Sequence, residues 1–320
     1  MSLPRVVFVD RATIPAHIYF PELPFEHQWV SYDETSPSQL LERVHDADVI
    51  ITNKVVLNAD SLSQLPKLRL IAVAATGVNN VDIEYCRAHG IAVTNVQGYA
   101  TRSVPEHVIG MIFALRRHLM AYHHDIGRGE WQQRRQFCFF THPIGDVADS
   151  TIGIIGHGTL GQATAELARA VGMQVIFAER KGASVCREGR LPFETVLRQA
   201  DVVSLHCPLT EETHHLLGAD ELSMMKANAI LINTGRGGLV DEAALVDALT
   251  SGTIAAAGVD VFTQEPADER NPLVANIDLP NLLLTPHIAW GSDSAIQQLV
   301  QRLVDNITVF HQGQKQNRIV

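Results

Sequence analysis

Residues 152–161 read Ile-Gly-Ile-Ile-Gly-His-Gly-Thr-Leu-Gly and decide the fold of this chain. They place Gly156, Gly158 and Gly161 between an apolar strand and an amphipathic helix that we expect to begin near Thr159. The first glycine of such a loop permits a tight turn, the second lets the backbone approach a diphosphate, and the third lets helix and strand pack closely. The free N–H groups at the helix start attract phosphate. The sequence therefore predicts a dinucleotide-binding α/β domain.

A carboxylate follows the next expected strand, Gln174–Ala178. Glu179 comes 23 residues after Gly156, near the spacing at which an acid holds the ribose hydroxyls of NAD. Such an acid repels the additional phosphate of NADP, whereas cations attract it. Arg180 and Lys181 come directly after Glu179. We expect NAD(H) as the favoured cofactor and leave NADP(H) open because of these two cations.

The composition is that of a globular chain with a large core. Its 320 residues suffice for two domains, and 46% are hydrophobic while 19% are charged. A net charge of −10 argues against a nucleic-acid or anionic membrane surface. No apolar run approaches the ~18 residues of a membrane span, and the first residues show no signal-peptide pattern. Four cysteines without C-x-x-C spacing suit a cytoplasmic protein: Cys86, Cys138, Cys186 and Cys207.

The histidines show no metal-binding spacing. Fifteen are present, but none forms an H-x-x-x-H or H-E-x-x-H motif. The doublets His123–His124 and His214–His215 read better as helix ends or loops, so we expect no metal site.

Short strands alternate with helical segments over the first hundred residues, which favours a flavodoxin-like domain with a parallel sheet. Its expected strands are Arg5–Val9, His27–Ser31, Asp48–Thr52, Leu70–Ala74 and Ile91–Thr94, and its expected helices are Ser38–Val44, Asp60–Leu65 and Asp82–His89. A final helix, with Ser294 and Gln297 spaced as a capping box, is expected to return to this domain. The predicted substrate domain is therefore discontinuous, 1–100 plus 288–320.

The predicted dinucleotide-binding domain, 101–287, is a doubly wound Rossmann fold. We expect a long helix from Arg102 to His123 and an aromatic stretch at Gly127–Asp149, which could cover a substrate, meet a partner subunit or simply pack. Six strands follow: Thr151–Ile155, Gln174–Ala178, Asp201–Leu205, Ala229–Asn233, Ala255–Val259 and Asn281–Thr285.

Polar side chains follow three of these strands and meet at one sheet edge. Arg236 offers a planar fork that matches a carboxylate, and His287 can give a proton to a ketone oxygen that gains charge during hydride transfer. Glu265 would orient the imidazole and favour its protonated form. Asp260 ends a strand at the same edge. These groups predict an oxidoreductase acting on a small 2-keto acid.

Motifs along nearly the whole chain, in the same order, resemble those of the D-isomer-specific 2-hydroxyacid dehydrogenase family. Some segments of the chain are also similar to the glycerate dehydrogenase (hydroxypyruvate reductase) branch of that family. The matching segments are Ala75–Asp82, Gly153–Gly161, His206–Thr210, Asn233–Asp241, Gly258–Val261 and Thr285–Trp290, with Phe137–Ile144 and Asn271-Pro-Leu for the branch.

The resemblance implies roles for individual residues. It makes His287 the acid/base, Glu265 its partner, Arg236 the substrate anchor, and Asp260 the residue that positions the nicotinamide carboxamide. It also implies substrate contacts from the backbone at Thr76 and Gly77. The implied cofactor contacts are Gly156, Gly158, Thr159, Leu160, Gly161 and Glu179, with His206, Cys207 and Pro208 on the adenosine side and Thr234 and Gly235 beside the nicotinamide. Members of the family are usually homodimers.

Two small departures from the family pattern, His157 and Gly235, leave this chemistry in place. The sequence thus predicts an NAD(H)-dependent reductase, with hydroxypyruvate to D-glycerate as the first substrate to test and glyoxylate beside it. A broader D-2-hydroxyacid or D-lactate-type dehydrogenase is the alternative within the chemistry, and an NAD(H)-sensing binding protein is the alternative outside it. The role of the Phe137–Phe140 loop stays open.

Overall fold

The computed structural model describes residues 3–320, which divide into two compact units. The first unit consists of residues 3–100 and 291–320, and the second of residues 101–290. Each is an α/β fold on a parallel sheet, which confirms the predicted fold class. Within the described residues, no helix combines the length and the apolar character that crossing a membrane would require.

Five parallel strands form the sheet of the first unit, in the flavodoxin-like order β2-β1-β3-β4-β5. Buried side chains such as Val7, Ile50 and Ile71 form its core. Its elements are β1 (Arg5–Phe8), β2 (Gln28–Ser31), α1 (Pro37–Val44), β3 (Val49–Thr52), α2 (Ala59–Leu62), β4 (Leu70–Val73), α3 (Ile83–His89), β5 (Ala92–Thr94) and α12 (Asp293–His311). After α12 the chain end lies along β5, where Ile319 N donates to Val93 O at 2.7 Å.

Seven parallel strands form the sheet of the second unit, in the order β12-β11-β10-β9-β6-β7-β8. The strand order reverses between β6 and β9, as in doubly wound dinucleotide-binding folds. The strands are β6 (Thr151–Ile155), β7 (Gln174–Ala178), β8 (Arg190–Leu191), β9 (Val202–Leu205), β10 (Ile230–Asn233), β11 (Ala256–Val259) and β12 (Leu282–Leu284). The helices are α4 (Ser103–Arg116), α5 (Leu119–Gly127), α6 (Glu130–Arg134), α7 (Thr159–Ala170), α8 (Phe193–Gln199), α9 (Ala219–Met224), α10 (Glu242–Ser251) and α11 (Pro272–Ala275).

The strand ends predicted from the sequence agree with the observed strands to within one residue. The central strands of the second sheet are buried on both faces, and they read as nearly continuous apolar runs for that reason. The missed strand is β8, which makes seven strands where six were predicted. With only two residues, Arg190 and Leu191, it is too short for any alternation of apolar and polar side chains.

The predicted long helix from Arg102 to His123 is wrong, because it is broken at His118. This residue has φ +50°, in the left-handed region, so α4 ends before it and α5 begins after it. The apolar stripe of α4 is buried as far as Leu115, but Leu119 is 55% exposed. A repeat of apolar residues does not reveal one residue with an inverted backbone angle.

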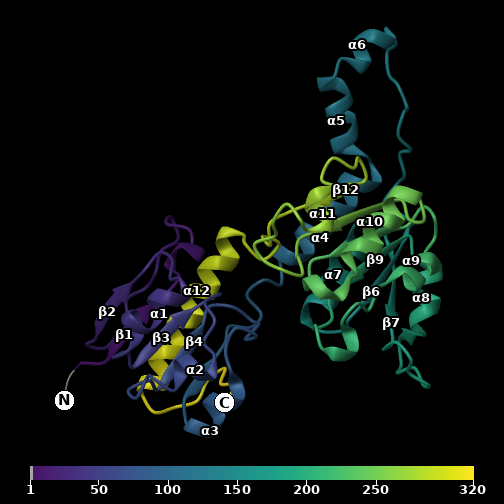
Figure 1. Cartoon of the computed structure of the whole chain (residues 1–320). Helices are drawn as coiled ribbons and strands as arrows, with labels where there is room; N and C mark the ends of the chain where they lie inside the picture. Colours follow the sequence, from purple (N-terminus) through teal and green to yellow (C-terminus); the bar gives the residue numbers. More distant parts are fainter. Residues whose placement is uncertain (1–2) are drawn as a thin grey trace. The chain divides into compact units, whose positions relative to one another are not determined.

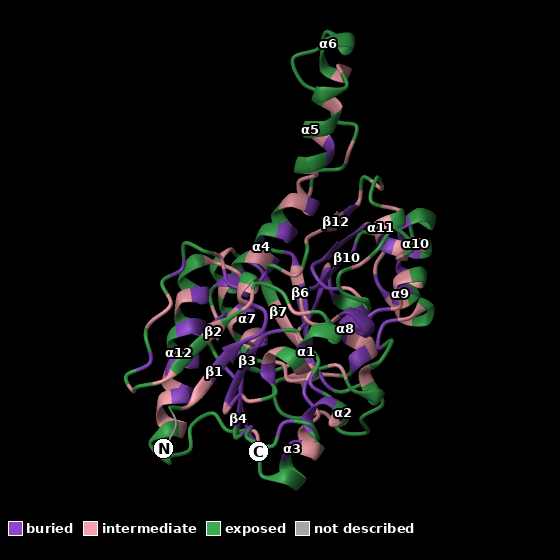
Figure 2. Cartoon of the chain, turned by 60° about the vertical axis from the view of Figure 1, so that its left-hand side comes forward, coloured by how far each residue is buried: buried purple, intermediate pink, exposed green. Residues whose placement is uncertain are grey.

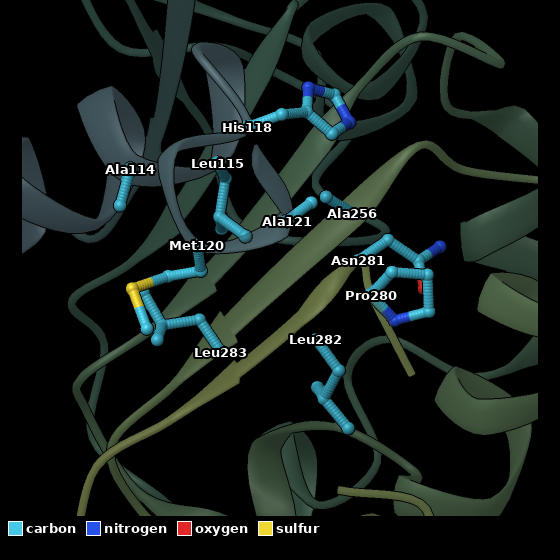
Figure 3. Close-up of a pocket in the computed structure, with 10 residues that line it drawn as sticks. All are labelled: Ala114, Leu115, His118, Met120, Ala121, Ala256, Pro280, Asn281, Leu282 and Leu283. Atoms are coloured by element: carbon cyan, nitrogen blue, oxygen red, sulfur yellow. The ribbon is translucent and has the colours of Figure 1, made fainter. Parts of the chain in front are cut away.

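Beyond this break the chain forms an arm. Helices α5 and α6 project from the body of the second unit, and most of their residues are exposed (Figures 1 and 2). At its base, a cavity of about 20 Å³ lies between the α4–α5 junction and strands β11 and β12, with His118 and Met120 among its lining residues (Figure 3).

The predicted capping box of the last helix is also wrong. The cap of α12 is Ser292, whose hydroxyl accepts a hydrogen bond from Ala295 N at 3.3 Å. Gln297 instead donates its side-chain amide to the carbonyl of Tyr19, at 2.8 Å. The S-x-x-Q spacing favours Ser294, because Ala295 stands three residues after Ser292, so this spacing selects the wrong serine.

Candidate active site

The glycine loop joins β6 to α7 at the carboxyl edge of the second sheet. Gly156 has φ +113°, and a Cβ on it would lie 2.5 Å from the carbonyl atoms of His206. A Cβ on Gly161 would lie 2.0 Å from Gly156 O. A Cβ on Gly158 would meet nothing within 4 Å. Close packing inside the protein therefore demands the first and third glycines, whereas the second faces open space.

The start of α7 can accept an anion. Gly158 is the residue before the helix and Thr159 is its first residue; both are exposed, and Leu160 is half-buried. Among the described residues, no side chain caps this end. The first N–H groups of the helix, together with its dipole, therefore suit a phosphate group. The open space at Gly158 and this uncapped helix end fit the diphosphate of a dinucleotide.

The side chain of Glu179, directly after β7, is already bonded within the protein. The residue is 4% exposed, and its carboxylate accepts hydrogen bonds from Arg180 N at 2.8 Å, from Arg187 N at 3.0 Å and from Arg187 Nε at 2.7 Å. Arg187 Nη2 donates to it as well. The Arg187 side chain, followed by the Arg180 N–H, holds the pKa of Glu179 well below its usual range. Glu179 therefore stays ionised.

Directly after β9 come His206, Cys207 and Pro208, and the backbone of the first two lies against Gly156 of the glycine loop. His206 N donates to Ile155 O at 2.7 Å, and the His206 ring pairs with Ser204 Oγ at 2.9 Å. Burial lowers the pKa of His206 to about 4 and raises the pKa of the Cys207 thiol to about 11. Both side chains are therefore uncharged near neutral pH, as suits the surface beside an adenosine.

The loop after β10 is folded by its own side chains. Asn233 is buried; its Oδ1 accepts from Gly235 N at 3.1 Å and its Nδ2 donates to Arg236 O at 2.9 Å. A Cβ on Gly237 would lie 2.0 Å from the carbonyl of Phe262, so only glycine permits this approach. These contacts fix the backbone that carries Arg236.

Two polar groups of this loop have capacity left for a ligand. The buried hydroxyl of Thr234 has no hydrogen-bond partner among residues 3–320. The Arg236 guanidinium donates to Gly235 O at 2.7 Å, and no carboxylate of the described chain lies within 4.0 Å of it. Arg236 is thus not part of an internal ion pair, and its guanidinium suits an external carboxylate.

His287 and Glu265 form a close pair. His287 Nδ1 lies 2.7 Å from Glu265 Oε2, and Phe262 N donates to Glu265 Oε1 at 3.0 Å. Because an ionised carboxylate only accepts hydrogen bonds, Nδ1 carries the donated hydrogen and Nε2 is the ring atom that can exchange a proton. The side chains are 22% and 31% exposed, so a small molecule can reach them.

Asp260 holds the backbone of the His287 turn. Its fully buried carboxylate accepts hydrogen bonds from Thr285 Oγ1 at 2.5 Å, from Ile288 N at 2.9 Å and from Ala289 N at 2.9 Å. His287, with φ +55°, donates its N–H to Asp260 O at 2.7 Å. Asp260 therefore stabilises an unfavourable backbone angle at His287. The contact with a carboxamide stays a prediction.

The remaining predicted residues belong to the first unit. Thr76 and Gly77 follow β4; Thr76 is exposed, its hydroxyl donates to Val96 O at 2.7 Å, and its carbonyl accepts from Asn95 Nδ2 at 2.7 Å. Their role in substrate binding stays a prediction.

Sequence reasoning missed Arg187 and Arg190, both near the Glu179 carboxylate. A signal was present, because residues 180–190 hold four cations directly after the strand-ending acid: Arg180, Lys181, Arg187 and Arg190. Their contacts could not be read from the sequence, since they depend on β8.

Residues 109–289 match the family described as D-isomer specific 2-hydroxyacid dehydrogenase, NAD binding domain. The chain belongs to this family. As a 2-hydroxyacid dehydrogenase it is 48% identical over 314 residues to the glycerate dehydrogenase of Methylorubrum extorquens, covering 98% of both chains. It is 34% identical over 294 residues to the hydroxypyruvate reductase of Blautia hydrogenotrophica, covering 90% of both chains.

Solved structures of similar dehydrogenases contain either form of the cofactor. An acyclic imino acid reductase in complex with NADPH and D-arginine superposes with a TM-score of 0.83 at 26% identity, covering 99% of this chain and 100% of that one. The D-lactate dehydrogenase of Aquifex aeolicus, complexed with NAD and lactic acid, has a TM-score of 0.78 at 27% identity and 96% coverage of both chains. The 2-hydroxyacid dehydrogenase described here therefore has an NAD(P)-binding domain.

Proposed function

We propose that this 2-hydroxyacid dehydrogenase reduces hydroxypyruvate to D-glycerate, and glyoxylate more slowly. One observation carries the proposal: the second unit brings a His287–Glu265 pair, 2.7 Å apart, to the sheet edge where Arg236 has no internal carboxylate partner. The similarity to a glycerate dehydrogenase and a hydroxypyruvate reductase supports this choice of substrate.

The residues of this edge divide the reaction among them. A bound reduced nicotinamide supplies the hydride. Arg236 binds the substrate carboxylate with two parallel hydrogen bonds and so fixes the keto carbon. His287 Nε2 donates a proton to the keto oxygen as negative charge develops there. Glu265, bonded to Nδ1, stabilises the protonated ring before the transfer and keeps its orientation afterwards.

The cofactor and substrate contacts outside this edge are part of the same proposal. Gly158, Thr159 and Leu160 would hold the diphosphate, and Thr234 would meet the nicotinamide side with its unpartnered hydroxyl. Thr76 and Gly77 are proposed substrate contacts of the first unit. NADH is the proposed cofactor, and the hydrogen bonds of Glu179 bear on whether NADPH is used as well.

We further propose that the chain forms a homodimer in the cytoplasm. The arm exposes Phe137 at 94% and Phe140 at 75%, which is costly for large apolar side chains unless another surface covers them. The four free cysteines fit a reducing compartment. Replacing both phenylalanines by serine should convert the dimer into a monomer in light scattering; an unchanged mass would remove the arm from the interface.

The function is tested by following dinucleotide oxidation with hydroxypyruvate, glyoxylate and pyruvate offered separately. We expect hydroxypyruvate to give the highest kcat/KM and the product to have the D configuration. A clear preference for pyruvate would favour the D-lactate-type alternative. Tight NADH binding without turnover on any of the three would favour another 2-keto acid or the sensing role.

A further inference from the structure

The acceptor capacity of Glu179 is used inside the protein. A carboxylate offers about four lone-pair positions. Four hydrogen bonds already reach the two oxygens of Glu179: one from Arg180 N, and three from Arg187, through N, Nε and Nη2. A ribose diol would need two acceptor positions on the same group. This carboxylate can provide them only by releasing Arg187.

The backbone delivers Arg187 to this place. Strand β8 pairs with the end of β7, with Arg190 opposite Phe177, and Glu179 N donates to Leu191 O at 2.8 Å. The loop 180–189 therefore returns to the end of β7. It also brings Arg190 Nη1 to 3.6 Å from Glu179 Oε1. The pairing of β8 with β7 thus brings the backbone N–H of Arg187 within 3.0 Å of the Glu179 carboxylate, and the Arg187 side chain adds its own donors from the same position.

The charge at this edge is positive in spite of the glutamate. Glu179 contributes one negative charge, whereas Arg187 and Arg190 contribute two positive charges within its reach. In the same loop, exposed Arg180 adds a third positive charge and exposed Glu188 a second negative one, while Lys181 pairs with Glu221 at 2.8 Å. The sum is still positive. The repulsion of a phosphate that the glutamate alone would cause is therefore more than compensated.

Arg187 has donors left for a ligand. Its side chain is 52% exposed, and only two of the five N–H groups of its guanidinium point to Glu179, those on Nε and Nη2. The glycine loop lies close by, because the ring of His157 packs on Phe177 of β7 with centroids 4.5 Å apart. A dinucleotide with its diphosphate on the loop would place its adenosine ribose toward the end of β7.

We propose that Arg187 sets the cofactor specificity: it occupies Glu179 and binds the ribose 2′-phosphate, so that the enzyme uses NADPH as well as NADH. The inference rests on the proposed function, because it assumes a dinucleotide on the glycine loop. The residue that decides the specificity is then the partner of the strand-ending acid and not the acid itself.

The test measures binding directly, without substrate. Dissociation constants for NADH and NADPH are determined by titration of nicotinamide fluorescence, and competition by adenosine 2′,5′-bisphosphate is compared with competition by 5′-AMP. For the unchanged protein we expect the NADPH constant to be no more than about tenfold above that for NADH, and the bisphosphate to compete better than 5′-AMP. Arg187→Gln should weaken NADPH binding about tenfold or more, whereas NADH binding should stay equal or become tighter, because Glu179 regains free acceptor positions for the ribose diol.

Arg169→Gln is the matched control, because Arg169 is an exposed arginine in the last turn of α7, at the opposite end of that helix from the glycine loop. It should leave both constants unchanged. Arg187→Lys serves if the glutamine variant fails to fold; it keeps a charge but loses the paired donors, and should also weaken NADPH selectively.

Several outcomes would overturn the inference. One is an NADPH constant in the unchanged protein more than tenfold above that for NADH; another is an Arg187→Gln variant whose ratio of the two constants does not change. In Glu179→Gln, a loss of NADH affinity of tenfold would show that the glutamate releases Arg187 to hold the ribose. If neither dinucleotide binds the unchanged protein, the proposed function fails first, and this result is distinct from the others.

Discussion

Glu265 and Glu179 both follow strands of the second sheet, at its carboxyl edge, but their surroundings differ. The side chain of Glu265 is 31% exposed and bonded to an imidazole, His287, whose charge changes during the proposed reaction. The side chain of Glu179 is 3% exposed and bonded to an arginine, whose charge is permanent. The first carboxylate can respond to a proton, whereas the second acts as a structural anion. The type of residue at a strand end therefore does not define its role; the partner does.

The largest effect is expected for His287. His287→Ala should reduce kcat by about 10²–10⁴, because the keto oxygen loses its proton donor, while the NADH dissociation constant stays unchanged. Steady-state kinetics and fluorescence titration check the two parts. His123→Ala, at an exposed histidine of α5, is the control. Turnover retained in the His287 variant would remove this residue from the acid/base role.

Replacing Arg236 should act on substrate binding. Arg236→Gln is expected to lower kcat/KM for hydroxypyruvate about hundredfold, because two charge-assisted hydrogen bonds of about 1.5–3 kcal/mol each are weakened. This loss of kcat/KM should appear mainly as an increase in KM. Arg198→Gln, at an exposed arginine of α8, provides the matched control. An unchanged KM with a normal kcat would contradict the anchor role.

A pair of isosteric substitutions tests the comparison of the two carboxylates itself. Glu265→Gln should lower kcat about tenfold, because the His287 ring loses the charged acceptor that holds its Nδ1–H and its orientation. Glu179→Gln should leave kcat within about threefold, since its side chain does not touch the reacting atoms. Equal losses of kcat in both variants would show that Glu265 and Glu179 do not differ in their contribution to turnover.

The glycine loop separates a packing requirement from a binding requirement. Gly158→Ala should raise the NADH dissociation constant about tenfold without lowering the melting temperature, because its Cβ meets no protein atom but would stand where a phosphate must approach. Gly156→Ala should destabilise the fold, since its Cβ would lie 2.5 Å from the His206 backbone. Thermal unfolding and titration distinguish the two variants; the same loss of stability in both would contradict this assignment.

The smallest effect is expected for His206, which directly follows β9. Its pKa is about 4 in the folded protein, below the ordinary 6.5, so the unfolded chain takes up the proton first as the pH falls. Its contribution to stability is therefore lost between pH 6.5 and about 4. His206→Gln should flatten this decline by up to about 1.4 kcal/mol per pH unit in urea unfolding. If the free energy of unfolding falls equally with pH in both proteins, His206 is not neutral in the folded protein.

The sequence allowed the fold class and the strand ends to be predicted because buried parallel strands are continuous apolar runs with polar residues directly after them. For the same reason the sequence placed Arg236 and His287 directly after strands of this sheet, and their roles stay predictions. The partners of Glu179 could not, because they depend on a strand of two residues paired at a distance along the chain. The break of the long helix depends on one backbone angle at His118, which no repeat of side chains encodes.

The left-handed turn at His118 also separates two parts of the chain that selection can alter independently. Before the turn, α4 packs against the sheet so closely that a Cβ on Gly258 of β11 would lie 2.9 Å from Met111 Sδ. After it, the arm carries side chains such as Phe137 that touch little of their own chain. Mutations at the arm can therefore accumulate, and alter the proposed subunit interface, without disturbing the strands of the second sheet. Descendants of this sequence can therefore diverge at the arm while the residues of the sheet edge are inherited unchanged.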